Sequence, residues 1–242
     1  MSLRRWTAQQ TLGALLATAL VLGASGVSAQ SGEAECGDPF RNHFGPFDYR
    51  TASKADKDLV ERAHFTPKVE SLRGGNTTMT AGGDMAYTLN VFPNHHRALL
   101  AMIKLGQKEK TNRPRDFGYS IECRFDRAER FAPNDAVVKS LHGVYLMQKG
   151  LYQDARKKLE EALELAGDNA NIHYNLGLAY FELKDYDKAL ASAHKAYQLG
   201  FQLPGLRNKL EKAGKWRDPS PAPVSQESPS SSGPSAGESS GQ

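Results

Sequence analysis

Apolar side chains follow a helical period in the second half of the chain. Two runs have the three- and four-residue spacing that places side chains on one face of a helix. The first run is Ile172, Leu176, Ala179, Tyr180 and Leu183. After a turn at 184–185, the second run is Tyr186, Ala189, Leu190, Ala193 and Tyr197. The pattern predicts an antiparallel pair of amphipathic helices that ends at Gly200.

The preceding segment repeats this pattern 34 residues earlier in the chain. The matched positions are Gly143 with Gly177, Tyr152 with Tyr186, Ala155 with Ala189, and Ala162 with Ala196. Lys158 falls opposite Ser192 and does not match. A fixed period of this length is typical of stacked helix–turn–helix arrays, whose units bury their apolar faces against each other. We therefore expect two consecutive repeats, 136–169 and 170–203.

These two segments resemble tetratricopeptide repeats. The resemblance rests on the runs 174–180 (YNLGLAY) and 185–190 (DYDKAL), together with Tyr152, Ala155 and 161–165 (EALEL) in the first copy. The segments depart from the family at one position of the outgoing helix. The family usually has an aromatic residue there, and the two segments have Lys139 and His173. The resemblance implies an all-α, right-handed helical solenoid that acts as a binding scaffold and not as an enzyme.

Weaker patterns extend the array in both directions. Ala128 lies 34 residues before Ala162, which predicts a divergent repeat over 93–135 with a helix from His95 to Leu105 and a long loop from Gly106 to Ser120. Within 30–92, which starts with an irregular amino-terminal arm, we expect a degenerate helix pair at 58–65 and 84–92. The Gly- and Thr-rich segment 73–84 is expected to be a mobile loop. The expected solenoid therefore has about three helix pairs, and a capping helix is expected after it, within 204–216.

The two ends of the chain have different chemistry. Residues 1–29 combine a basic start, an apolar run from Leu12 to Leu22 and small residues up to Ala29, which is typical of a secretory signal peptide cleaved before Gln30. The alternative is a membrane anchor, but the run is short for a bilayer core of roughly 30 Å. The segment 217–242 is rich in Ser, Pro and Gly, so we expect it to be disordered.

The net charge is +4 and includes two signal-segment arginines, Arg4 and Arg5. The mature chain would therefore carry about +2, and its Lys and Arg residues are scattered. We expect no nucleic acid partner. After signal cleavage we expect no membrane span. The predicted location is periplasmic or secreted, with a protein partner in the cell envelope.

The two cysteines, Cys36 and Cys123, are the only ones in the chain. In an exported protein an even count favours a disulfide, and two unpaired buried thiols are the alternative. A bridge would fasten the aromatic arm at 36–49 to the helical array. The arm has no helical period, and its aromatic residues are expected either to pack beside the array or to fill its groove.

The resemblance implies that the outgoing helices line a concave groove. Helical phase assigns to that groove Val137, Ser140, Val144, Met147, Gln148, Asn171, Tyr174, Asn175, Leu178, Phe181 and Glu182. This strip is apolar and aromatic, which suits an amphipathic helix or an extended segment of a partner. The clamp that some family members use for acidic carboxyl-terminal peptides needs several Lys, Arg and Asn residues. Only Asn175 matches it, so that clamp is not expected.

Other chemistry has weaker support in the sequence. His95 and His96 are the best metal candidates, but adjacent helical residues point about 100° apart and cannot easily hold one ion from one face. We expect no cofactor. A metal-binding protein or enzyme that uses the histidines and the amino-terminal region is the alternative function, and self-assembly through the repeats is a further one. The oligomeric state is left open.

Overall fold

A computed structural model describes residues 36–219, and all of the secondary structure given within that range is helical. The expected signal segment at 1–29 and residues 220–242 of the expected tail lie outside the described residues. The helices are α2 (Lys54–His64), α3 (Pro67–Glu70), α4 (Ala81–Val91), α5 (His96–Glu109), α6 (Ile121–Phe131), α7 (Ala136–Gln148), α8 (Tyr152–Ala166), α9 (Ala170–Glu182), α10 (Tyr186–Gln198) and α11 (Gly205–Lys212). Within residues 36–219, no helix is both long enough and apolar enough to span a bilayer.

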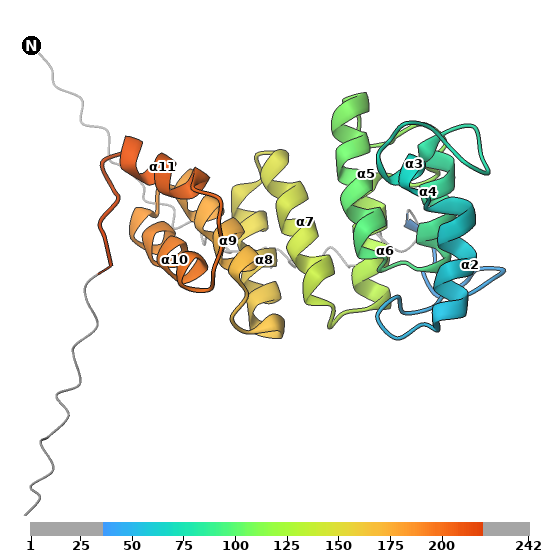
Figure 1. The fold of residues 1–242 in the computed structure, drawn as a ribbon, viewed down its shortest axis with the longest axis horizontal. Coiled ribbons are helices and arrows are strands. Elements are labelled where there is room, and N and C mark those ends of the chain that lie inside the picture. The colour runs from blue at the N-terminus through green and yellow to red at the C-terminus, as the bar shows by residue number, and fades with distance from the viewer. Residues whose placement is uncertain (1–35, 220–242) are drawn as a thin grey trace, which may run out of the picture.

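The helices stack into one elongated row, as the repeat pattern predicts (Figure 1). The closest pairs are α7 with α8 and α9 with α10, and α8 also packs on α9. Along one side of the row, each outgoing helix contacts the next, from α5 through α7 and α9 to α11. This continuous side is termed the inner face. The all-α repeat architecture expected from the sequence is therefore confirmed.

Side chains at the helix starts explain where most of these helices begin. A side-chain atom of the residue before the helix accepts a hydrogen bond from an N–H group of the first turn, which would otherwise have no partner. Six such caps are Ser53, Thr80, Ser120, Asp135, Asn169 and Asp185. Local sequence therefore sets these boundaries before any packing occurs.

The glycines matched between the two repeats mark close approaches between helices. A Cβ atom on Gly143 would lie 2.6 Å from Cγ of Leu159, on the return helix α8. A Cβ atom on Gly177 would lie 2.5 Å from a methyl carbon of Leu206, on α11, and 3.3 Å from the carbonyl oxygen of Ala189. Any larger side chain would push the helices apart, which explains why both copies have glycine here.

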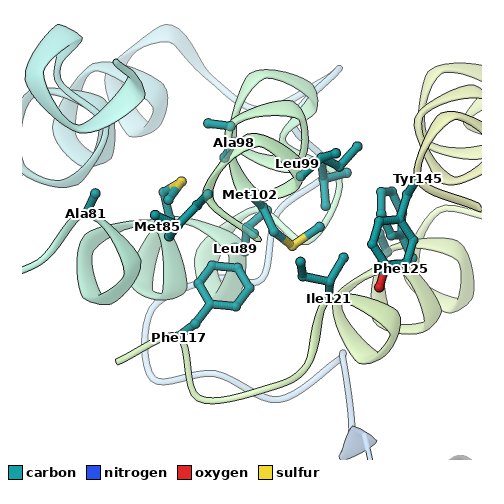
Figure 2. Packing of buried hydrophobic residues seen from close by; sticks show 14 of the residues in the cluster. Ala81, Met85, Leu89, Ala98, Leu99, Met102, Phe117, Ile121, Phe125 and Tyr145 are labelled. Atoms are coloured by element: carbon teal, nitrogen blue, oxygen red, sulfur yellow. The ribbon is translucent and has the colours of Figure 1, made fainter. Parts of the chain in front are cut away.

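Two apolar clusters form the core, and α7 connects them. The first cluster lies between α4, α5, α6 and α7 and includes Met85, Met102, Phe125 and Tyr145 (Figure 2). The second cluster joins α8, α9, α10 and α11 through Leu159, Leu176, Ala193, Leu206 and Leu210. Because α7 supplies Val138 and Tyr145 to the first cluster while Gly143 contacts Leu159 of the second, the core runs through both halves.

The weaker helices expected in the first half are present, with shifted bounds. The expected helices at 58–65, 84–92 and 95–105 correspond to α2, α4 and α5, and the long loop expected before α6 spans 110–120. The expected mobile loop at 73–84 is wrong in part. Its end forms the first turn of α4, and buried Asp84 accepts hydrogen bonds from the backbone N–H groups of residues 76–78. One carboxylate therefore fixes the loop.

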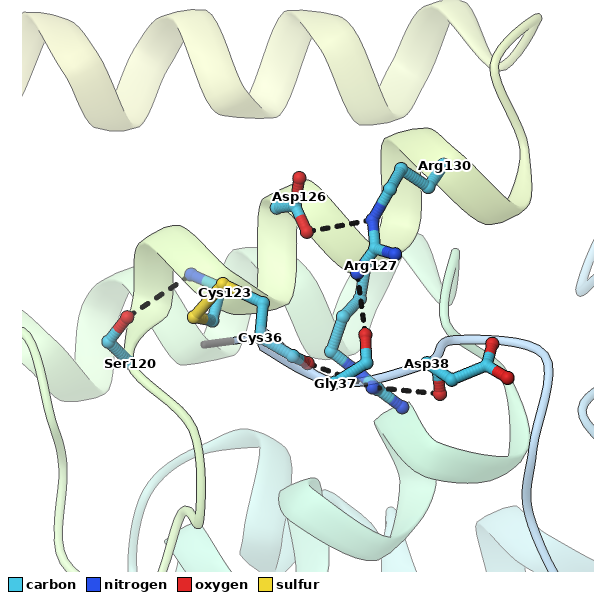
Figure 3. The surroundings of a disulfide bond; sticks show 8 residues. All are labelled: Cys36, Gly37, Asp38, Ser120, Cys123, Asp126, Arg127 and Arg130. Atoms are coloured by element: carbon cyan, nitrogen blue, oxygen red, sulfur yellow. Dashed lines mark hydrogen bonds and ion pairs between the residues drawn. A yellow bond between two sulfur atoms is a disulfide. The ribbon is translucent and has the colours of Figure 1, made fainter. Parts of the chain in front are cut away.

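The amino-terminal arm packs beside α6, α2 and α4. The sulfur atoms of Cys36 and Cys123 lie 2.03 Å apart, which is bonding distance (Figure 3). Next to them, Arg127 donates to the carbonyl oxygens of Cys36 and Asp38 at 3.1 and 3.0 Å, and Arg130 donates to that of Gly37 at 2.6 Å. The guanidinium groups of α6 thus donate hydrogen bonds to backbone carbonyl groups of the arm. Backbone N–H groups have this role in a strand or helix.

Replacement of the buried Leu159 by Ala should lower the free energy of unfolding by about 2–5 kcal/mol, because the side chain is fully buried and leaves a cavity. The matched control is Leu165→Ala on the same helix, where the side chain is 46% exposed and the expected change is within about 0.5 kcal/mol. Urea denaturation followed by circular dichroism measures both. Equal losses for the two variants would contradict this packing.

Candidate functional site

The predicted groove residues lie on α7 and α9, two of the outgoing helices that form the inner face, and none of them is fully buried. On α7, Val137 is 44% exposed, Gln148 is exposed, and Ser140, Val144 and Met147 are half-buried. On α9, Asn171 is exposed and the others are half-buried, namely Tyr174, Asn175, Leu178, Phe181 and Glu182. Since α7 and α9 contact each other, these side chains form neighbouring strips on one side of the array.

The chain itself covers the α9 end of the inner face. The ring of Tyr174 stacks on that of Phe201 with 4.0 Å between centroids. Lys209 of α11 places its ammonium group 5.1 Å from the centre of the Phe181 ring and 2.9 Å from the carboxylate of Glu182. Tyr174, Phe181 and Glu182 therefore have partners within the chain, and Leu178 and Met147 pack against the second cluster. The open part of the inner face lies toward Val137 and Val144 of α7.

The aromatic arm does not occupy this strip. Phe44, Phe47 and Tyr49 pack on a small cluster around Phe92, between α2 and α4. Phe40 lies 5.6 Å from Phe131 at the end of α6, between ring centroids. Of the two arrangements expected from the sequence, residues 36–49 adopt packing beside the array, so they leave the inner face of α7 free.

The inner face continues onto α5, which lies outside the groove predicted from the sequence. A Pro-Asn dipeptide precedes both helices, at 93–94 before α5 and at 133–134 before α7, so the two helices start in the same phase. The positions on α5 that correspond to the α7 strip are all exposed: Arg97, Leu100, Lys104, Gln107 and Lys108. The repeated dipeptide, 40 residues apart, was the sequence signal that could have located them.

A hollow of about 540 Å³ lies where the carboxyl-terminal ends of α5 and α7 meet the start of α6. It is lined by Ile103, Gly106, Gln107, Lys110, Thr111, Asn112, Ile121, Tyr145, Gln148 and Lys149. The set includes Gln148, a predicted groove residue, and inner-face Gln107 of α5. The floor is apolar, because Ile103 and Ile121 are buried, and the rim is polar. This junction hollow is therefore part of the inner face.

The two histidines considered as metal ligands have separate partners. His95 is buried; its Nδ1 accepts a hydrogen bond from the N–H of Ala98, so Nε2 carries the proton and points to Glu61 at 3.2 Å. Burial lowers the pKa of His95 against the opposing effect of Glu61. Nε2 of His96 lies 2.8 Å from the Asp135 carboxylate. The described residues contain no group of three or more His, Cys, Asp or Glu side chains arranged to hold a metal ion.

A second group of ionisable side chains joins α6 to α7 and α8. Its centre is Glu129, which lies 2.6 Å from Nζ of Lys158 and also contacts His142 and Lys139. Burial raises the pKa of Glu129, but hydrogen bonds from His142 and Lys158 outweigh that effect and lower it to about 2. These charges are paired with one another, so the group holds helices together. The two repeats differ at this position because the side chains have different surroundings. Lys158 pairs with Glu129, whereas Ser192 is buried near Gly177.

Comparison with known proteins supports the assignment of the repeats. A family model described as tetratricopeptide repeat matches residues 141–203, which cover most of α7, all of α8, α9 and α10, and the loop before α11. A search of curated proteins finds no match to the chain. The match identifies the repeats expected from the sequence, and it ends before α11.

Glu129 should make the stability of the protein depend on acid pH. Its pKa is about 2 in the folded protein and 4.5 for a free glutamate side chain, so its contribution is present above pH ~4.5 and is lost as pH falls toward 2. At pH 7, Glu129→Gln should cost on the order of 3 kcal/mol, and this difference should shrink at pH 3 and below.

Urea denaturation of both proteins at pH 7, 4 and 2.5 measures the effect. The matched control is Glu164→Gln on α8, where the side chain is exposed and carries no ion pair within residues 36–219. A Glu129→Gln loss that stays constant from pH 7 to pH 2.5 would contradict the proposed linkage.

Proposed function

We propose that this protein binds a peptide or helix of another protein through the inner face of its array. The observation that carries the proposal is the partly exposed apolar strip on α7. Val137 and Val144 stay open there, while Val138 and Tyr145 pack in the first cluster and Met147 packs against the second. Tetratricopeptide repeats are protein–protein interaction scaffolds, and the match at 141–203 includes most of this helix. Apolar strips between helices suit amphipathic partner helices and extended segments.

The proposed role is structural and needs no cofactor. Two pairs of titratable groups near the inner face serve helix packing: Glu182 pairs with Lys209, and Tyr145 donates its hydroxyl proton to Glu122. Burial and that hydrogen bond raise the pKa of Tyr145 above its ordinary value. A tyrosine held in its neutral form by a carboxylate is a donor in a fixed network. Nothing in this arrangement presents an activated nucleophile or base to a bound segment.

The proposed location is the cell envelope or the exterior, with the partner in the same compartment. Two features support export: the signal-like segment before Gln30, and the sulfur atoms of Cys36 and Cys123 at bonding distance. Disulfides persist in oxidising compartments, and this pair would close a loop with a sequence separation of 87. Cross-linking a loop of that size stabilises a fold by roughly 4 kcal/mol in chain-entropy models.

The groove proposal predicts that acidic substitutions on α7 weaken binding of the partner protein. Val137→Glu/Val144→Glu should reduce captured partner at least about tenfold, because two carboxylates in an apolar contact are costly to desolvate. The matched control is Leu151→Glu/Leu165→Glu, at positions 48% and 46% exposed at the start and near the end of α8, away from the inner face. The measurement is cross-linked affinity capture from envelope extracts of the source organism, quantified by mass spectrometry. Equal capture by both double variants would count against the inner face.

The export proposal predicts the covalent state of the mature chain. Protein purified from its native source should begin at Gln30, since cleavage follows Ala29. Intact-mass measurement of denatured, unreduced protein treated with iodoacetamide should show no alkylation, and reduced protein should gain two adducts. A native chain that retains residues 1–29, or that takes up two adducts without reduction, would contradict export or the disulfide respectively.

A further inference from the structure

We propose that the partner segment carries an acidic side chain next to its apolar residues, and that this carboxylate enters the junction hollow between α5 and α7. This inference rests on the proposed function and adds the chemistry and register of the bound segment. It places apolar side chains of the segment over the α7 strip and its acidic end at the carboxyl-terminal ends of α5 and α7.

The junction hollow offers hydrogen-bond donors and positive charge without a competing carboxylate. Lys110, Lys149, Asn112 and Gln148 are among its lining residues, and no Asp or Glu lines it. The Glu122 carboxylate nearby accepts the hydroxyl proton of Tyr145. Within the described part of the chain, neither Lys110 nor Lys149 forms an ion pair, so both charges are available to an incoming anion. Amide groups and ammonium groups around one opening are the donors that a carboxylate prefers.

Two helices end at this hollow, and helix carboxyl termini favour cations when their carbonyl groups are unpaired. Here several of those carbonyl groups already accept a hydrogen bond. The carbonyl of Gly106 accepts from the N–H of Thr111 at 3.0 Å, and that of Leu146 accepts from the N–H of Leu151 at 3.0 Å. The carbonyl of Met147 accepts from the N–H of Gly150, also at 3.0 Å. The lysine ammonium groups therefore dominate the local charge.

Charge along the inner face gives the register. On α5, Arg97 is paired with Glu70 and Glu61, Lys104 acts on Glu70, and Lys108 donates to the carbonyl oxygen of Leu72 at 2.7 Å. The exposed apolar residues lie in the amino-terminal halves of the two helices, with Leu100 of α5 38% and Val137 of α7 44% exposed. At the α9 end, Lys209 is neutralised by Glu182. The positive charges of Lys110 and Lys149 thus lie at the carboxyl-terminal end of the α7 strip, which complements a segment that is acidic at one end.

The apolar floor of the hollow favours a protein segment over a nucleic acid. Ile103 and Ile121 are buried beneath the rim, and the aromatic ring of Tyr145 lies between α7 and α6. A methylene chain that ends in a carboxylate, as in Glu or Asp, fits a hollow with an apolar floor and a cationic rim. Phosphate-backbone binding relies on many cationic contacts along a continuous track.

The test uses the full mature chain and a random twelve-residue peptide library displayed on phage. Enriched peptides should carry one or more Asp or Glu residues within a few positions of an apolar cluster. A synthetic copy of the strongest peptide should bind with a Kd that rises several-fold between 50 and 300 mM NaCl, because its charge contact is partly screened. Lys110→Glu and Lys149→Glu should each raise that Kd at least about tenfold.

The matched control is Lys157→Glu, an exposed lysine of α8 that forms no ion pair within residues 36–219, and it should leave Kd unchanged. Peptides without acidic enrichment, lost in Val137→Glu/Val144→Glu but unaffected by Lys149→Glu, would overturn this inference and leave the proposed function standing. Selected peptides whose Kd is unchanged in Val137→Glu/Val144→Glu would overturn the proposed function. Binding to phosphatidylglycerol vesicles that is lost in Lys149→Glu, with no peptide enriched, would assign the hollow to lipid headgroups and overturn the inference.

Discussion

Each helix pair of this array has an apolar stripe that only its neighbours can cover, and this constraint governs the structure. Helix α7 shows it best. One side of α7 supplies Val138 and Tyr145 to the cluster around α5 and α6, and another places Gly143 against Leu159 of α8. The remaining side faces along the row of outgoing helices, where Val137 stays exposed and Val144 half-buried on the inner face. The proposed binding strip is therefore a consequence of stacking helices in a row.

Polar contacts hold the divergent first half of the chain to this row. Asp135 caps α7 through the N–H groups of Val137 and Val138, and the same carboxylate accepts from Asn94 at 2.9 Å and contacts His96 at 2.8 Å. Burial raises the pKa of Asp135, but the contacts with His96 and Asn94 outweigh it and the pKa is lowered. One buried acid thus fixes the start of α7 relative to the start of α5.

The carboxyl-terminal end shows how a cap changes a binding surface. By sequence alone, Tyr174, Leu178 and Phe181 resemble the α7 strip in composition and phase. In the structure, Phe201 and Lys209 pack on two of these three side chains. Because α11 contacts α9 where a further outgoing helix would lie, the cap protects aromatic surface at the end of the row. The inner face is consequently asymmetric, closed at α9 and open at α5 and α7.

The sequence by itself determined the helices and their repetition. Apolar periodicity and capping side chains such as Asp135 and Asn169 are local, so helix identity and the 34-residue repeat could be predicted without knowledge of packing. Only the tertiary structure decided which inner-face residues stay open, where the aromatic arm lies and how α5 joins α7. Those outcomes depend on contacts between residues far apart in the chain, such as Arg127 with Cys36 or Tyr174 with Phe201. Exposure is a property of the neighbours that a residue acquires, and a helical period specifies only the face on which it lies.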